Sequence, residues 1–192
     1  MPEHHQKATS PDECGIYLIT GTMASGKSAV AELLARRFAR GVHLRGDSFR
    51  RMIVSGREEM LPEPSPEAER QLKLRYRLAA DAAETYFAAG FTVVVQDVIV
   101  GPVLQGFVDQ FVSRPLFVVV LTPNPQVVAL REAGRSKQGY GLWTIAQLDD
   151  LLRNHTPRLG LWLDTSALTA EQTVDQILLR AQAEAAQPPR LG

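Results

Sequence analysis

The sequence predicts an α/β fold in which a five-stranded parallel sheet is sandwiched by helices. Short β-rich runs alternate with longer helical patterns from Gly15 onward. The runs are apolar on both faces, which is typical of central parallel strands that helices cover on both sides. The stretches between the runs are long enough for right-handed crossovers. No internal repeat or linker divides the 192 residues, so we expect a single domain.

The expected strands are the runs rich in β-branched and other apolar residues. They span residues 15–20, 42–45, 91–96, 116–121 and 161–164.

Three helices are predicted from apolar periodicity and end signals. One spans residues 29–40, with Gly41 as its stop signal, and another spans residues 72–90 and ends at Gly90 in the same way. The last runs from Thr169 to residue 186 and opens with a Thr-x-x-Gln capping box. The Pro- and Glu-rich stretch 57–70 is predicted to be a loop of the kind that often covers a site.

Residues 14–185 are expected to form the domain, with a flexible tail at 1–13 and a disordered tail at 186–192. The first tail lacks the apolar core of a secretory signal, and no run is long enough to span a bilayer. A single cysteine, Cys14, makes a reducing compartment the default. These features predict a cytoplasmic protein without a membrane partner, and they do not define an oligomeric state.

Charge composition bears on the class of partner. Lys+Arg 21 and Asp+Glu 21 give a formal net charge of zero. General binders of nucleic acid or anionic membranes carry a basic excess, so we expect a small-molecule partner and consider nucleic acid unlikely.

The strongest chemical signal is GTMASGKS at residues 21–28, which matches the Walker A pattern G-x-x-x-x-G-K-S between an apolar run and a helical pattern. In such a phosphate-binding loop the two glycines let the backbone wrap around a phosphate at the helix N-terminus. Lys27 is expected to reach the β- and γ-phosphates, and the Ser28 hydroxyl to ligate Mg²⁺. The predicted nucleotide contacts in this segment are Gly21, Thr22, Met23, Ala24, Ser25, Gly26, Lys27, Ser28 and Ala29.

The second strand run leads into Asp47, at the edge where α/β sheets collect ligands. A carboxylate there can accept the proton of a substrate hydroxyl that attacks the γ-phosphate, or it can cap the following helix. Residues 45–57 contain four arginines and one acid, a local charge of +3. This excess is compatible with a nearby anionic group or with arginines exposed on a helix face.

Two further segments are candidates for the site. Asp97 closes the third strand run and is expected to bind Mg²⁺ directly or through a water. Residues 131–143 place Arg131, Arg135 and Lys137 among glycines, which fits a lid that closes over the transferring phosphoryl group. Arg131 and Arg135 are therefore predicted to neutralise charge that develops during transfer.

With these elements in order, the sequence resembles the P-loop kinases of the nucleoside-monophosphate-kinase-like group, and most of all the chloramphenicol phosphotransferase-like proteins. The resemblance extends from Gly15 to about Ala183 and rests on GTMASGKS, on GDSFRRM at 46–52 and on VVVQDVIVGP at 93–102. It implies a P-loop NTPase fold with a short lid. It also implies that Asp47 is the catalytic aspartate, and that Gln96 and Asp97 replace the acidic pair of the family.

The same resemblance extends to the nucleotide. The segment from Leu163 through Thr165 resembles the adenine-side turn of small-molecule kinases, which implies that Thr165 and Arg131 contact the nucleotide. No N-K-x-D guanine motif occurs, so ATP is favoured over GTP. We therefore expect an ATP- and Mg²⁺-dependent phosphotransferase acting on a hydroxyl of a small molecule, such as an antibiotic or metabolite. The alternatives are a kinase of a nucleotide-sugar or nucleic-acid end, and a nucleotide-binding regulatory ATPase.

Overall fold

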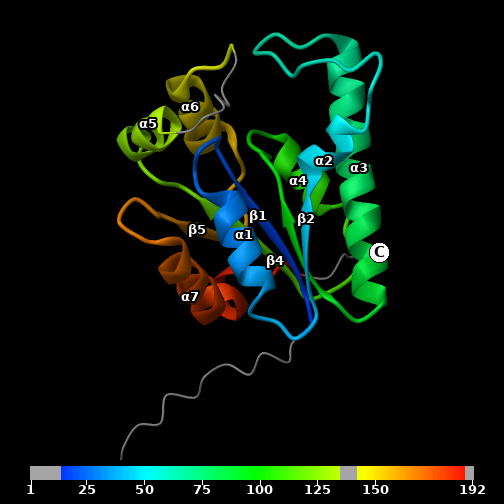
Figure 1. Ribbon diagram of the computed structural model, residues 1–192, viewed down its shortest axis with the longest axis vertical. Coiled ribbons are helices and arrows are strands. Elements are labelled where there is room, and N and C mark those ends of the chain that lie inside the picture. The colour runs from blue at the N-terminus through cyan, green and yellow to red at the C-terminus, as the bar shows by residue number, and fades with distance from the viewer. Residues whose placement is uncertain (1–13, 135–141, 189–192) are drawn as a thin grey trace, which may run out of the picture.

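The computed structural model describes residues 14–134 and 142–188, and its centre is a parallel sheet of five strands (Figure 1). Their order across the sheet is β2-β3-β1-β4-β5, and each neighbouring pair is parallel. The predicted fold class and all five strand runs are confirmed. The strands are β1 (Ile16–Gly21), β2 (Gly41–Arg45), β3 (Thr92–Gln96), β4 (Leu116–Leu121) and β5 (Leu161–Leu163).

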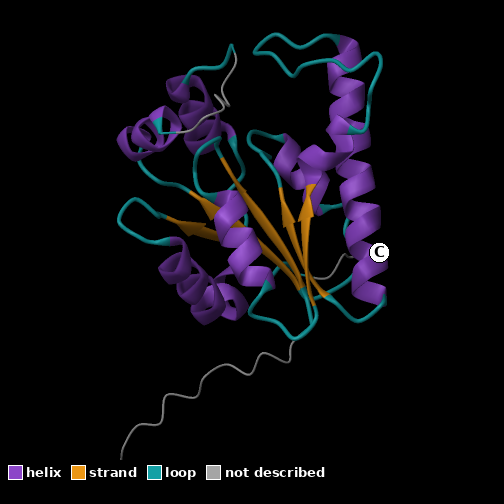
Figure 2. Cartoon of the chain, in the orientation of Figure 1, coloured by secondary structure: helices purple, strands orange, loops and turns teal. Residues whose placement is uncertain are grey.

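Helices cover both faces of this sheet, as Figure 2 shows. On one face, α1 (Lys27–Ala35) and α7 (Ala170–Arg180) pack on side chains that include Tyr17 and Ile19. On the other face, α3 (Pro66–Ala88) and α4 (Val103–Val108) pack on side chains that include Ile16 and Leu18. Alternate residues of β1 thus enter opposite cores, which explains why its sequence is apolar throughout.

Three further helices lie near the carboxyl ends of the strands. They are α2 (Gly46–Arg51), α5 (Pro125–Ala133) and α6 (Ile145–His155). In Figure 1, α5 and α6 lie to the upper left of the strand ends, and α2 with the start of α3 lies to the upper right. Val128 of α5 and Leu148 of α6 form a small core that also includes Met23 and Ala24 of the loop after β1. This edge of the sheet therefore lies between two helical flanks.

The ends of the helices differ from the sequence expectations. Helix α1 ends at Ala35, and Gly41 is the first residue of β2, where an added Cβ would lie 1.9 Å from the carbonyl oxygen of Ala35. Gly41 therefore allows the start of β2 to pack closely against the end of α1, and it is not the residue that ends the helix. Helix α3 starts at Pro66, capped by the Ser65 side chain, so residues 66–70 are helical and not a loop.

The C-terminal segment also differs from expectation. Helix α7 has the predicted Thr169 capping box but ends at Arg180, and a π-helix (Ala181–Ala185) follows. The tail from residue 186 was expected to be disordered, yet Ala186 forms an antiparallel bridge with Phe117, and the Gln187 N–H donates to the Leu116 oxygen at 2.8 Å. The predicted tails 1–13 and 189–192 lie outside the described residues. Among the helices described, none combines the length and apolarity needed to cross a bilayer.

Candidate functional site

The loop from β1 to α1 curls tightly, and its glycines make the curl possible. Gly21 and Gly26 have φ values of 142° and 96°, in a region that disfavours side chains. A Cβ at Gly21 would also lie 2.5 Å from the Leu121 oxygen of the neighbouring strand. Ala24, with φ 58°, adopts the left-handed conformation without being glycine, which is a strained state often found at functional sites.

The ammonium of Lys27 lies within this loop. Its Nζ donates to the Thr22 oxygen at 2.5 Å and to Ser25 Oγ at 3.4 Å, and the residue is only 5% exposed. Gly26, the N-cap of α1, provides no side-chain cap, and no acidic residue occupies the first turn. The helix N-terminus therefore presents backbone N–H groups beside a buried cation, an arrangement suited to a phosphate group.

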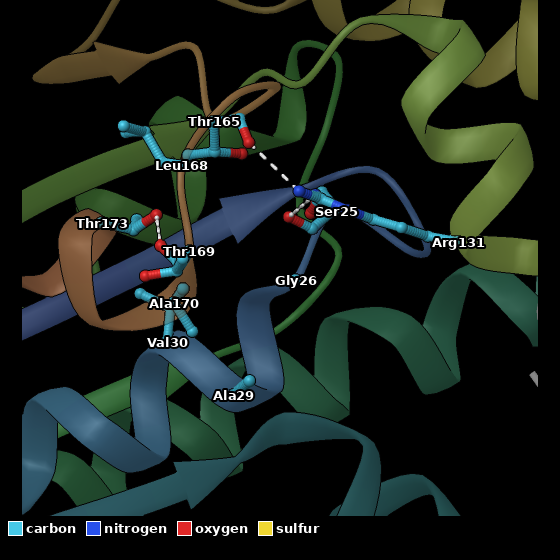
Figure 3. Close-up of a pocket in the computed structure, with 10 residues that line it drawn as sticks. All are labelled: Ser25, Gly26, Ala29, Val30, Arg131, Thr165, Leu168, Thr169, Ala170 and Thr173. Atoms are coloured by element: carbon cyan, nitrogen blue, oxygen red, sulfur yellow. Dashed lines mark hydrogen bonds between the residues drawn. The ribbon is translucent and has the colours of Figure 1, made fainter. Parts of the chain in front are cut away.

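A pocket of about 280 Å³ lies beside the loop, between α1, α5 and the turn from β5 to α7 (Figure 3). Arg131 extends from α5 to this pocket, where Nη1 donates to the Ser25 oxygen at 3.3 Å and Nη2 to the Thr165 oxygen at 3.1 Å. The lining residues are Ser25, Gly26, Ala29, Val30, Arg131, Thr165, Leu168, Thr169, Ala170 and Thr173. The structure thus brings together five residues predicted to contact the nucleotide: Ser25, Gly26, Ala29, Arg131 and Thr165.

Oxygen atoms suited to a magnesium ion come from Ser28 and Gln96. The Ser28 hydroxyl donates to Gln96 Oε1 at 3.2 Å, which joins the start of α1 to the end of β3. No group of three or more His, Cys, Asp or Glu residues suited to a metal occurs within the described segments. In phosphate-binding loops the Ser or Thr hydroxyl after the lysine is a ligand of Mg²⁺, and phosphate and water oxygens provide much of the remaining coordination, so Ser28 with Gln96 beside it fits an ion that arrives with a nucleotide.

Asp97 lies against Arg75 of α3. Arg75 Nε donates to Oδ2 at 2.6 Å, Arg75 Nη2 donates to Oδ1, and the Val98 N–H donates to Oδ1 at 2.7 Å. The aspartate is 3% exposed, and this burial raises its pKa although the Arg75 charge opposes the shift. The ionised form of Asp97 therefore depends on Arg75, and Gln96 is the residue that contacts Ser28.

Arg75 is a site residue that the sequence reasoning missed. In the sequence, Arg75 is one of several charged residues in the helical pattern 72–90, and nothing adjacent to it marks a site. One turn later on the same helix face stands Ala79, which is 1% exposed. A charged residue on the same helix face as a small apolar residue that is expected to be buried is the signal that could have identified Arg75.

Asp47 lies in the first turn of α2, next to this ion pair. Gly46 separates it from β2, and a Cβ on that glycine would lie 2.1 Å from Asp97 Oδ2. The Asp47 carboxylate accepts from Arg51 Nε at 2.6 Å and from Arg50 Nε at 3.4 Å. The N-cap of α2 is Arg45, without a side-chain cap, so Asp47 does not perform the capping role considered as its alternative.

The electrostatics of Asp47 favour its ionised form. Partial burial raises its pKa, but the hydrogen bond and charge of Arg51, together with Arg75 and Arg50, outweigh burial and lower the pKa below the ordinary value. At neutral pH the carboxylate is thus able to accept a proton.

The two flanks of this edge meet above the strand ends. Trp143, just before α6, donates from Nε1 to the Met60 oxygen at 2.9 Å. Gln71 of α3 fixes the facing segment, because it donates to the Gly56 oxygen at 2.8 Å and accepts from the Glu58 N–H at 3.0 Å. The predicted covering loop therefore contacts the end of the predicted lid. Arg135 and Lys137, the other predicted lid cations, lie outside the described residues.

Comparison with known proteins supports this architecture. The sequence profile of the AAA domain family matches residues 16–158. No curated protein sequence gives a significant match. A sugar kinase from Janibacter sp. HTCC2649 is 15% identical with a TM-score of 0.65, over 87% of this chain and 94% of that chain.

Two further solved structures are similar. The tunicamycin resistance protein of Deinococcus radiodurans is 16% identical with a TM-score of 0.63, over 92% of this chain and 100% of that chain. The APS kinase of Mycobacterium tuberculosis, solved with AMPPNP and APS, is 18% identical with a TM-score of 0.62, over 88% of this chain and 99% of that chain. At these identities the likeness establishes a P-loop kinase-like fold.

Proposed function

The chain belongs to the AAA domain family, and on this basis we propose that it is an ATP- and Mg²⁺-dependent phosphotransferase that acts on a hydroxyl group of a small molecule. One observation carries the proposal: the Lys27 loop follows β1 and the Asp47 carboxylate follows β2, so both lie at the same edge of the sheet with only β3 between their strands. A phosphate cradle beside a carboxylate that can accept a proton is the minimum required for transfer to a hydroxyl.

The nucleotide is assigned to the loop and the adjoining pocket. Loop N–H groups and Lys27 hold the β- and γ-phosphates, and the pocket lined by Ala29, Arg131 and Thr165 holds the nucleoside. Because Arg131 already contacts the loop and the β5–α7 turn, its role in this proposal includes nucleotide binding as well as neutralising charge during transfer.

Ser28 is the proposed direct ligand of Mg²⁺, with Gln96 Oε1 beside it. When bound, the ion neutralises charge on the phosphate oxygens. Asp97 is proposed to act on this site through its negative charge and not as a direct ligand, because its two oxygens already accept three hydrogen bonds from Arg75 and the Val98 N–H.

Asp47 is the proposed general base. The acceptor hydroxyl oxygen attacks the γ-phosphorus, its proton passes to the Asp47 carboxylate, and the bond from the γ-phosphorus to the ADP oxygen breaks. Arg135, in the segment outside the described residues, is proposed to neutralise charge that develops during this step. Positioning and electrostatics account for catalysis, so no covalent enzyme intermediate is needed.

Antibiotics are among the candidate acceptors. This finer assignment rests on the resemblance to the chloramphenicol phosphotransferase-like proteins, and likeness to a tunicamycin resistance protein supports it. Sugars and other hydroxylated metabolites are equally compatible with the fold, since unrelated acceptors share such scaffolds.

Substituting Lys27 tests the proposal, because its ammonium lies in the loop and outside the apolar cores. In Lys27→Ala we expect loss of phosphoryl transfer from ATP to an acceptor panel of sugars, antibiotics and nucleosides, with the fold retained by circular dichroism. Lys73→Ala, an exposed lysine of α3, is the matched control and should transfer normally. Equal transfer by both variants would contradict the proposed loop function.

The same assay separates the alternative functions. A regulatory ATPase would hydrolyse ATP at a rate independent of every acceptor. A nucleotide-sugar and an oligonucleotide with a free 5′-hydroxyl are added to the panel for the other alternative, and a kinase of nucleotide-sugars or nucleic-acid ends would phosphorylate only these two additions. Acceptor-dependent product from a small hydroxylated molecule is the result that the proposal predicts.

A further inference from the structure

We propose that the acceptor is an uncharged hydroxyl compound and not one that carries a carboxylate or phosphate. This inference rests on the proposed function, because it takes the surroundings of Asp47 to be the acceptor side of the site. The local charge of +3 over residues 45–57 had left open an anionic group near these arginines. The structure shows which groups the arginines around Asp47 pair with.

Both arginines of α2 are paired with carboxylates. Arg51 donates to Asp47 at 2.6 Å, and Arg50 donates to Glu59 at 2.7 Å and to Asp47 at 3.4 Å. Burial opposes the charge of Arg50, but Glu59 and Asp47 outweigh it and raise the pKa of its guanidinium. Its pairing with Arg50 places Glu59 beside α2, on the acceptor side of the proposed site.

Arg75, the third arginine near Asp47, is paired with the buried Asp97. Three guanidinium groups, Arg50, Arg51 and Arg75, are therefore matched by three carboxylates, Asp47, Glu59 and Asp97. The cluster as a whole has no net charge. An anionic acceptor would therefore meet no net positive charge in this cluster and would approach the negative Asp47, which opposes its binding.

Three other cations near the cluster, Arg45, Lys73 and Arg77, face away from it. Arg45 pairs in register with Gln96, whose side chain reaches Ser28 on α1, so Arg45 lies on the α1 face of the sheet and toward the phosphate side. Lys73 and Arg77 are each two residues from Arg75, which places them on the far side of α3. Arg57 is exposed and forms no ion pair within the described part of the chain.

The paired arginines still suit a neutral acceptor. A guanidinium has five N–H donors, and the bonds to Asp47 and Glu59 use two different nitrogens of Arg50. Donors that point away from the carboxylates can bind hydroxyl or ether oxygens without displacing an ion pair. The cluster thus provides polar recognition without selecting for negative charge.

Matched acceptor pairs test the inference. The probes are sugars and polyols, each compared with its carboxylate or monophosphate derivative that retains the same free hydroxyls, and kcat/KM is measured for acceptor-dependent phosphorylation. We expect the neutral member to exceed its anionic partner by about tenfold or more. Preference for the anionic member would overturn the acceptor class and leave the phosphotransferase function standing. Absence of transfer to every member of a broad panel would overturn the proposed function and this inference with it.

A charge-release variant provides the second readout. Glu59→Gln frees Arg50 from its nearest carboxylate, so kcat/KM for the anionic member should rise about fivefold relative to the neutral member. Glu184→Gln removes one partner of the Arg180–Glu184 pair at the end of α7 and is the matched control. If Glu59→Gln and Glu184→Gln gave the same ratio as the wild type, neutralisation by Glu59 would not determine acceptor charge.

Discussion

Asp47 is held in its ionised form by neighbouring arginines, and this has a consequence for pH dependence. Its lowered pKa keeps the base form present as pH falls from 7 to 5, so transfer should not lose activity through Asp47 in that range. In Arg51→Ala the strongest lowering contact is removed, and the acid limb of the pH–rate profile should move to higher pH. Profiles of kcat/KM for the two proteins measure this shift. Superimposable acid limbs would show that another group controls the profile.

Arg131 connects two walls of the pocket through single side-chain hydrogen bonds. Arg131→Ala should therefore weaken ATP binding by about tenfold, the loss expected for a charged hydrogen-bonding group. Isothermal calorimetry measures the Kd, with Arg36→Ala, from an exposed ion pair of α1, as the control. An unchanged Kd with a reduced kcat would restrict Arg131 to charge neutralisation during transfer.

At the scale of elements, the ends of β2 and β3 are joined to α3 by Gly46, Asp97 and Arg75. Because a Cβ at Gly46 would lie 2.1 Å from a carboxylate that is itself buried, Gly46→Ala should lower the free energy of unfolding by about 1–3 kcal/mol. It should also reduce transfer, since Asp47 is the next residue.

Gly106→Ala provides the control for this substitution. Its added Cβ meets nothing within 4 Å in helix α4, so its stability should equal or exceed that of the wild type. Denaturant unfolding compares the variants. Equal stability of Gly46→Ala and wild type would contradict the close packing of these strand ends.

The strands could be predicted because their signal is local. Continuous apolar runs such as 116–121 require burial on both faces, whatever the rest of the chain does. Helix ends were harder to predict, because Gly41 signals close packing against Ala35 as readily as it signals a helix end. Ser65 with Pro66 is a helix start signal, but it lies within a Pro-rich stretch whose composition favours a loop.

For the candidate site, contiguous motifs could be predicted from the sequence, but contacts between distant segments could not. The Walker A pattern is contiguous, so the Lys27 loop and its partners could be named from the sequence. The Arg75–Asp97 pair joins residues 22 positions apart, and the packing of α3 decides which carboxylate Arg75 meets. The sequence likewise shows the local charge excess around Arg50 and Arg51 but not their ion pairs. Those pairs depend on the fold, which brings Glu59 to Arg50.

At the scale of the whole molecule, the pocket and the arginine–carboxylate cluster lie on opposite sides of the Lys27 loop, along one edge of the sheet. In the proposed function, the pocket beside α1, α5 and α7 holds the nucleotide, and the cluster from α2, α3 and the end of β3 lies on the acceptor side. The Trp143–Met60 hydrogen bond joins the two flanks above the strand ends. The Lys27 loop lies between the pocket and the cluster, so the proposed function gives a phosphoryl group bound there the nucleotide on one side and the acceptor on the other.

The most direct test of this account compares wild type with Asp47→Asn on the same preparations. The Asp47 ion pairs are partly exposed and contribute about 0–1 kcal/mol, so the variant should fold. Calorimetry should give an unchanged Kd for ATP, because the loop and pocket hold the nucleotide. Transfer to the acceptor should fall by about 10²–10⁴-fold, the contribution of a positioned base. Wild-type transfer by Asp47→Asn, with ATP still bound, would contradict the assignment of this strand end as the site of chemistry.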